Sequence, residues 1–320
     1  MNIISSVFSI LRRVDVAHVA FPAGLSVLAL GCAVDAPLDR PDPGENLGQT
    51  TQAVSGWMPF GWGTTNDLYG LDTEVVNTNW NCVLSGVAGD LSKGRGWGAI
   101  SVNSAAKIER SGTFSANTFH ILAHGGAYEN QNGQRVWANN PVFASTTCIP
   151  YPQTDSASWR STADSVAPPV KISGLVTNRE CFLTGITGGE HLWNDSEKFG
   201  RVRKITTPDA THPTSGWYVE GNERSDVDGG HAYVTASCVD FPSLALLWDT
   251  PKEAPAGGAA VTVPITTGGG VKACGLRTIR GAFNKNSWTD GVRITPPSSA
   301  TGTWNMTVSA GKFGRAVCVL

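Results

Sequence analysis

One eight-residue pattern occurs three times in the chain, and it constrains the fold more than any other feature of the sequence. The pattern is Cys-x-Leu-x-x-[Val/Ile]-x-Gly, and it begins at Cys82, Cys181 and Cys274. Repetition at a regular spacing indicates a repeat architecture and changes the number of domains that the length suggests. The repeated unit is about 90 residues long, and the three units are 57–150, 151–240 and 241–320.

A second cysteine follows each pattern, in a strand-like segment rich in Ser, Thr and Ala. These segments read FASTTCI, YVTASCV and GRAVCVL. Three like copies predict three like disulfides, each contributing roughly 4 kcal/mol on the chain-entropy model. A zinc site is disfavoured because these cysteines lack the close CxxC spacing that such sites use. The predicted bonds are Cys82–Cys148, Cys181–Cys238 and Cys274–Cys318.

The secondary structure reads as strand almost throughout. Short runs of alternating, β-branched or aromatic residues, such as FGRVRKI and GWYVEGN, are separated by clusters of Gly, Pro, Asn and Asp. The 37 Gly, 18 Pro and 16% charged residues suit a turn-rich secreted protein. We therefore expect an all-β fold of three tandem disulfide-closed units. They form either small sandwich-like domains or one pseudo-threefold β assembly, and the pattern leaves both open.

The N-terminal segment is typical of an export signal. Arg12 and Arg13 precede an apolar stretch, 19–31, that is shorter than the roughly 20 residues of a membrane-spanning helix. Residues 1–31 are therefore interpreted as a signal peptide. The sequence Leu-Ala-Leu-Gly-Cys, which ends at Cys32, resembles the lipobox of bacterial lipoproteins. The resemblance implies that Cys32 is lipidated, which accounts for the odd seventh cysteine; an ordinary secretory peptide cleaved nearby is the alternative.

Residues 32–56 join the lipidated cysteine to the first unit. The segment carries Pro, Gly, Asp and Gln with almost no large apolar residue, so we expect a flexible tether. Ala33, rather than Asp, follows the cysteine, which resembles lipoproteins sorted to an outer membrane. Two or more acyl chains give stable attachment. The expected location is thus the outer membrane or cell surface, or the extracellular medium if no lipid is added.

Charge and motifs disfavour several classes of function. A net charge of −2, a pI near 6.3 and the lack of a basic stripe argue against nucleic-acid binding. The densest basic cluster, Arg201, Arg203 and Lys204, is interpreted as a solvated strand face. The sequence has no Gly-x-Ser-x-Gly, His-Glu-x-x-His or Walker-type loop. An enzyme is therefore the less favoured reading, and no cofactor is expected.

Two segments contain residues that bind metal ions in other contexts, and neither is predicted to be a metal site here. His120 and His124 lie on an expected strand, where residues four apart are about 13 Å from each other and cannot share one ion. The sequence DVDGGH at 226–231 begins like a calcium loop. Ser237 stands where the bidentate glutamate of such a loop would be, so a plain turn is favoured.

Each unit also places a tryptophan in a polar loop 12 to 15 residues after its repeat cysteine. These residues are Trp97, Trp193 and Trp288. An indole offers a large apolar face and one donor, which suits stacking on a sugar ring whose hydroxyls bond nearby polar groups. Three such loops would gain from multivalency. The alternative is that these tryptophans fold back to cap a small core.

The sequence therefore predicts an extracellular binding lipoprotein, with carbohydrate as the expected ligand and the lipid anchor as its contact with the membrane. A structural or adhesion protein with no small ligand, for which a surface protein is the expected partner, is the first alternative. A secreted hydrolase, whose catalytic groups converge only in the folded state, is the second.

Overall fold

The structure of the 320-residue chain is a computed structural model. The structure describes residues 58–64, 71–76, 79–93, 105–111, 118–130, 132, 134–138, 140–162, 165–189, 192–224, 231–242, 247–253, 259–265, 273–297 and 302–319. They all belong to one compact unit, residues 38–320. Cys32 and the expected signal peptide and tether lie outside the described residues.

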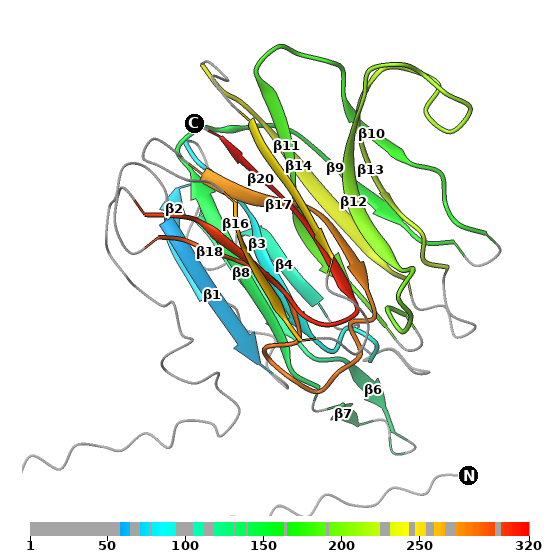
Figure 1. The fold of residues 1–320 in the computed structure, drawn as a ribbon. Coiled ribbons are helices and arrows are strands. Elements are labelled where there is room, and N and C mark those ends of the chain that lie inside the picture. The colour runs from blue at the N-terminus through cyan, green and yellow to red at the C-terminus, as the bar shows by residue number, and fades with distance from the viewer. Residues whose placement is uncertain are drawn as a thin grey trace, which may run out of the picture. The chain divides into compact units, whose positions relative to one another are not determined.

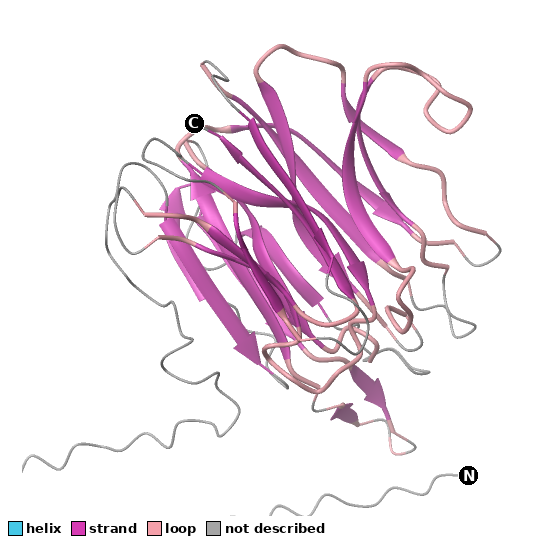
Figure 2. Ribbon diagram, in the orientation of Figure 1, coloured by secondary structure: helices cyan, strands magenta, loops and turns pink. Residues whose placement is uncertain are grey.

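The described residues contain twenty strands and no α-helix, which confirms the all-β fold class (Figures 1 and 2). It follows that this part of the chain offers no apolar helix long enough to span a membrane. Eighteen of the strands form three six-stranded antiparallel sheets. Each sheet is shared by two of the repeat units, and we name each sheet by those units.

The strands of each sheet are given in their order across it. The 1–3 sheet contains β1 (Met58–Thr64), β8 (Val142–Ile149), β3 (Asn81–Gly89), β18 (Gly291–Thr295), β19 (Asn305–Val308) and β16 (Val261–Pro264). The 1–2 sheet contains β2 (Leu71–Val76), β5 (Thr118–His124), β4 (Ala105–Ser111), β11 (Arg179–Thr187), β14 (Tyr233–Asp240) and β9 (Gln153–Arg160). The 2–3 sheet contains β10 (Val170–Ser173), β13 (Gly216–Gly221), β12 (Phe199–Ile205), β17 (Ala273–Gly281), β20 (Lys312–Val319) and β15 (Leu247–Glu253).

The same connectivity recurs in all three units. The first, third and last strands of a unit form half of one sheet, and its second, fourth and fifth strands form half of another. The first unit adds a small ribbon, β6 (Ala127–Glu129) and β7 (Arg135–Trp137), before its last strand. Each unit is thus divided between two sheets, and its two half-sheets contact each other, as β5 does with β1 and β8 in the first unit. The structure thus combines the two arrangements that the sequence allows, because each unit has two packed half-sheets and shared sheets join the units into one pseudo-threefold assembly.

Short ladders join the two halves of each sheet. In the 1–2 sheet, β4 pairs with β11 through Lys107–Gly185, Ala106–Ile186 and Ala105–Thr187. Equivalent three-pair ladders join β18 to β3 and β12 to β17. The other neighbouring strands pair over longer stretches, for example all seven residues of β4 with β5. The halves of a sheet therefore meet at one place and are free to diverge beyond it.

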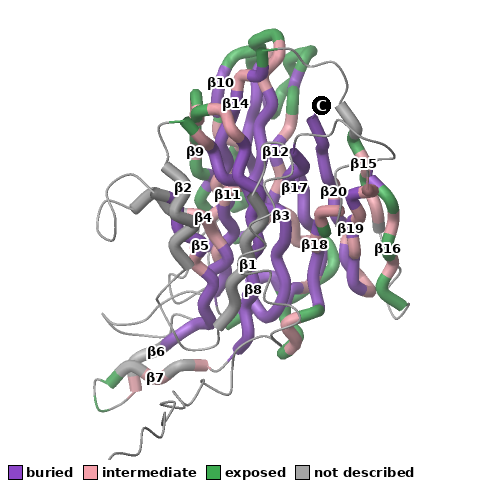
Figure 3. The backbone as a smooth tube through the Cα atoms, turned by 90° about the vertical axis from the view of Figure 1, so that its left-hand side faces the viewer, coloured by how far each residue is buried: buried purple, intermediate pink, exposed green. Residues whose placement is uncertain are grey.

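The three strands that carry the repeated pattern lie together at the centre. β3, β11 and β17 contact one another pairwise, and β3 is buried along its whole length (Figure 3). The residues after the three repeat cysteines are Val83, Phe182 and Gly275, and all three are close-packed. A Cβ added to Gly275 would lie 2.6 Å from Cδ1 of Phe182 and 2.8 Å from Cγ2 of Val83. The side chains of Phe182 and Val83 therefore fill the space beside Gly275, which has no side chain of its own.

Each pattern strand also bears a β-bulge at the same place. The register shifts between Leu84 and Gly86 in β3, and at the matching positions in β11 and β17. The residue left without an opposite partner is Ser85, Thr184 or Arg277. A bulge bends its strand and re-aims the extra side chain. The variable residue directly after the leucine of the pattern is thus the bulge residue in all three units.

The three predicted disulfides are confirmed. Each joins two cysteines that face each other across a strand pair, such as Cys82 on β3 and Cys148 on β8. All six cysteines are fully buried. The bonds link Cys82 to Cys148, Cys181 to Cys238 and Cys274 to Cys318, closing sequence separations of 66, 57 and 44 residues.

Candidate functional site

A hollow of about 710 Å³ opens in the 1–2 sheet, and it is the candidate site. Its volume is in the range of pockets that enclose a small ligand. Its wall includes residues of β4, β5, β9, β11 and β14, together with the start of β3. The described lining residues are Asn81, Cys82, Ala105, Lys107, Ile108, Phe119, His124, Gln153, Ser156, Ala157, Ser158, Thr184, Thr187, Tyr233, Thr235, Ala236 and Ser237.

The hollow lies where the two halves of the sheet diverge. The ladder between β4 and β11 ends at Lys107 and Gly185, although β4 continues to Ser111. The bulge at Thr184 follows directly on the β11 side. Because the two strands no longer pair beyond this point, core side chains and surface side chains line the same space.

The inner end of the hollow is apolar. Phe119 and the disulfide-bonded Cys82 and Cys148 form a small buried cluster against which Ile108 packs. Ala236 belongs to the main core and also lines the hollow. This end offers carbon and sulfur surface to a ligand and few hydrogen-bond partners.

The outer rim is rich in hydroxyl groups. Ser156 and Ser158 are exposed, because they lie on the outward-facing positions of β9, and Thr184 and Thr235 are half-buried. The Thr184 hydroxyl donates to Oγ1 of Thr235 at 3.1 Å. A hydroxyl has one donor and two acceptor sites, so each keeps hydrogen-bonding capacity for a ligand. None of the lining residues that the structure describes is Asp or Glu.

Tyr233 supplies the aromatic surface at the rim. It lies opposite Thr187, whose hydroxyl accepts a hydrogen bond of 2.9 Å from the Tyr233 amide. The guanidinium of Arg160 lies 5.6 Å from the centre of the tyrosine ring, and His231 meets the ring edge-on at 6.4 Å. Its neighbours therefore restrict the ring's orientation, and its half-buried state leaves part of the ring accessible.

The equivalent position in the 2–3 sheet carries a larger side chain than the one in the hollow. Ala105 corresponds to Phe199 in the 2–3 sheet, since each pairs with the seventh residue of a repeated pattern. There the guanidinium of Arg201 stacks 4.2 Å from the centre of the Phe199 ring. A methyl group replaces the benzyl group of Phe199, so the 1–2 sheet lacks the side chain that fills this place in the 2–3 sheet.

The basic residue of each ladder is also equivalent across the sheets. Lys107 corresponds to Arg201 and Arg293, and the Arg293 guanidinium lies 4.3 Å from the centre of the Phe143 ring. Arg201 also donates to Glu220 at 2.6 Å, and Arg203 lies 3.6 Å from the same carboxylate. The strand face that the sequence suggested was simply solvated therefore carries ion pairs.

Of the tryptophans proposed from sequence, Trp193 and Trp288 are not among the described residues that line the hollow. Trp97 lies outside the described residues. Trp193 has no exposed surface, its indole donates to the carbonyl of Thr187 at 3.1 Å, and its ring meets Phe283 edge-on at 5.8 Å. Trp288 is half-buried, and its carbonyl accepts a 3.1 Å hydrogen bond from Arg293. Trp193 therefore packs as a core residue, which is the alternative that the sequence left open for these tryptophans.

Local backbone geometry fixes Trp193 in that place. It adopts a positive φ of 54°, which is uncommon for a bulky residue. Its amide donates to the buried Glu223 carboxylate at 2.7 Å, and burial raises the pKa of Glu223. Lys198 lies 3.3 Å from the same carboxylate. Glu223 thus holds the turn that directs the indole inward.

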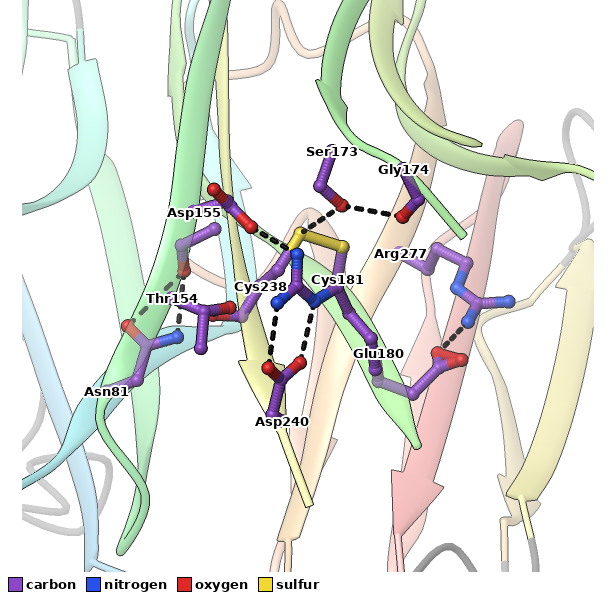
Figure 4. Close-up of a disulfide and its surroundings, with 12 residues drawn as sticks. Asn81, Thr154, Asp155, Ser173, Gly174, Glu180, Cys181, Cys238, Asp240 and Arg277 are labelled. Carbon is purple, nitrogen blue, oxygen red and sulfur yellow. Dashed lines mark hydrogen bonds and ion pairs between the residues drawn. A yellow bond between two sulfur atoms is a disulfide. The ribbon is translucent and has the colours of Figure 1, made fainter. Parts of the chain in front are cut away.

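A second polar cluster surrounds the Cys181–Cys238 disulfide (Figure 4). Arg179 donates to both carboxylate oxygens of Asp240, at 2.6 and 2.7 Å, and also binds Asp155. The hydrogen bonds from Arg179 lower the pKa of Asp240. This cluster fastens β9, β11 and β14 together, and we assign it a structural role.

The fully buried Glu180 lies on the other side of the same disulfide. It binds Arg277, the bulge residue of β17, across the contact between the second and third units. Burial raises the pKa of Glu180 although Arg277 opposes the shift. The Arg277 guanidinium also lies 4.9 Å from the centre of the Trp217 ring. The third bulge thus directs a charged side chain into a contact between units.

The segments weighed as metal sites are only partly described. His120 and His124 lie on β5, which is a strand as the sequence predicts. Nδ1 of His124 lies 2.9 Å from the carbonyl oxygen of Gly125. Of the 226–231 segment only His231 is described. Within the described residues, no three His, Cys, Asp or Glu side chains are grouped to hold a metal ion.

Sequence reasoning missed the hollow and with it Tyr233, Ser156 and Ser158. The alternation in TDSAS is a signal that could have placed these serines on an outward strand face, but it carries no information on what they line. No known protein family matches the sequence, and no curated protein matches it either.

Proposed function

We propose that the protein is a surface-anchored extracellular binding lipoprotein and that the hollow of the 1–2 sheet holds a carbohydrate. The observation that carries the proposal is the chemistry of the rim: four Ser and Thr side chains line the same hollow as one half-buried tyrosine. A sugar ring presents hydroxyls at its edge and C–H groups on its faces, so it can use both kinds of surface. The proposal moves the expected binding site from the loop tryptophans to Tyr233.

The anchoring part of the proposal rests on the sequence at Cys32 and on the disulfides. Three fully buried disulfides are typical of a protein that folds in an oxidising compartment. Lipidated Cys32 would hold the protein at the outer membrane or cell surface. Mass spectrometry of the mature N-terminus tests this. An acylated Cys32 supports the anchor, and an unmodified N-terminus beyond residue 32 overturns it.

A hydrolase that uses two carboxylates finds less support in this hollow, because its described lining residues carry none. A structural or adhesion role is the stronger rival, since the buried Trp193 behaves as a core residue. These two readings differ in whether any saccharide binds.

A comparison of two aromatic truncations tests the binding function. Purified mature protein is screened against a panel of glycans, and the best ligand is titrated by calorimetry into the wild type, Tyr233→Ala and Trp288→Ala. We expect about tenfold weaker binding for Tyr233→Ala, which corresponds to about 1.4 kcal/mol, and no change for Trp288→Ala. Loss of binding only in Trp288→Ala would return the site to the loops. If no glycan binds, the carbohydrate-binding proposal is wrong and the structural or adhesion role is favoured.

A further inference from the structure

The hollow has an apolar inner end, which a sugar without an apolar substituent would not contact. The inference drawn from this feature rests on the proposed carbohydrate-binding function. The inner end is formed by Ile108, Phe119 and the Cys82 side of a disulfide. A ring hydroxyl placed against this surface would lose its hydrogen bonds to water without gaining others. A ligand that fits the whole hollow therefore carries hydroxyls toward the rim and a small apolar group toward the core.

Two of the residues that line the hollow have amide side chains. Asn81 is fully buried, and its amide exchanges two hydrogen bonds with the Ser237 hydroxyl: Nδ2 donates to Oγ at 2.9 Å, and Oδ1 accepts from Oγ at 3.2 Å. Gln153, which is half-buried, lines the same hollow. A side-chain amide both donates and accepts, so it can pair with another amide through two complementary hydrogen bonds. The lining thus combines apolar surface, amide groups and hydroxyl groups.

One common sugar substituent has the matching parts. An acetamido group joins a methyl group to an amide and is attached directly to a hydroxylated ring. We propose that the hollow selects an N-acetylated sugar, with the acetyl methyl toward Ile108 and Phe119 and the ring hydroxyls toward the Ser156, Ser158 and Thr235 side chains. The volume of about 710 Å³ accommodates such a ligand.

Sugars that differ at one carbon test the selectivity directly. Calorimetric titrations of the full mature chain compare N-acetylglucosamine with glucose and N-acetylgalactosamine with galactose. We expect the acetylated member of at least one pair to bind ten or more times tighter. Equal or tighter binding of the plain sugars overturns this inference but leaves the carbohydrate function in place. If no sugar in these pairs or in the glycan panel binds, the proposed function fails as well.

Two substitutions locate the selectivity. Ile108→Thr keeps a β-branched side chain but replaces carbon surface with a hydroxyl, and we expect it to lower affinity for the acetylated sugar several-fold more than for the plain one. An equal loss for both sugars would contradict the assigned orientation. Ala105→Phe copies the residue that fills the equivalent place in the 2–3 sheet, and we expect it to abolish binding of both. Thr262→Phe, which adds the same ring at an exposed position of the 1–3 sheet, is the control.

A measurement on the wild type keeps the inference testable if a variant does not fold. In saturation-transfer NMR, protons of a bound ligand that lie closest to the protein receive the most saturation. The acetyl methyl should receive more than the ring protons. Stronger transfer to the ring protons than to the methyl would overturn the inference.

Discussion

Gly275 and Phe182 occupy equivalent positions of two repeats, and the ring of one fills the space that a side chain on the other would need. A Cβ on Gly275 would lie 2.6 Å from Cδ1 of Phe182. Protein interiors have the packing density of organic crystals, so a volume shared by three units cannot hold three large residues. The central contact therefore requires that equivalent positions carry different residues.

The shared volume gives the first prediction. Gly275→Ala should lower the free energy of unfolding by about 1–3 kcal/mol through overpacking. Phe182→Val removes the ring atom in contact, so the double variant should lose less than the sum of the two single changes. Urea denaturation measures this. Gly174→Ala, where a Cβ would meet nothing within 4 Å, is the control and should change stability by less than about 0.5 kcal/mol. Additive effects would show that the two positions are not coupled.

The second prediction concerns the Cys181–Cys238 disulfide. Replacing both cysteines with alanine releases a constraint over 57 residues and should lower the free energy of unfolding by about 4 kcal/mol. The same change at Cys274–Cys318, which spans 44 residues, should cost nearly as much because the entropy depends weakly on loop length. Thermal and urea denaturation of both variants test this. A loss below about 1 kcal/mol in either variant would contradict it.

The third prediction concerns acid stability and Asp240. Hydrogen bonds from Arg179 lower the pKa of Asp240. A lowered carboxyl pKa contributes stability that is present above the unfolded-state pKa and is lost as the pH falls through the folded-state pKa. The wild type should therefore lose more unfolding free energy between pH 5 and pH 2 than Asp240→Asn does. At pH 7 the variant should be less stable by about 1 kcal/mol or less, because the Asp240 carboxylate is partly exposed.

An exposed aspartate serves as the control for that measurement. Asp195 lies 3.8 Å from Lys198, and more than half of its side chain is exposed. Asp195→Asn should follow the wild-type acid profile closely. If Asp240→Asn also follows it, the Arg179 contact does not stabilise the fold.

The fourth prediction concerns the buried pair Glu180 and Arg277. Arg277→Met leaves an uncompensated buried carboxylate and should cost about 3–5 kcal/mol at pH 8. Burial raises the pKa of Glu180, so its penalty is absent at low pH and grows as the pH rises through the folded-state pKa. The variant should therefore be closer to the wild type at pH 5 than at pH 8. Adding Glu180→Gln should remove this pH dependence; its persistence would assign the effect to another group.

The sequence predicted those parts of the fold that depend on repetition and local pattern. The three Cys-x-Leu patterns were sufficient to pair the six cysteines, and alternation was sufficient to place β5 and β13 as strands. The sequence did not predict that each sheet would contain strands of two units. This sharing depends on three-pair ladders such as Lys107–Gly185, whose partners are distant in sequence and have no distinctive composition.

The candidate site was missed for a related reason. In the hollow, Ala105 stands where the second unit has Phe199, and this equivalence appears only when both residues are seen beside the pattern strands. Trp193 was placed in a solvated loop because its neighbours are polar. The residue that turns it inward, Glu223, lies 30 positions further along the chain.

The ladder between β18 and β3 returns the third unit to the first, so every unit has a neighbour on both sides. Solenoid proteins lengthen by adding repeats and need special sequences to cap their ends. Here a fourth copy would find no sheet half left to complete, and a missing copy would leave two halves exposed. Duplication or loss of a whole unit is thus not a small change for this protein, and its copy number is fixed by closure at three.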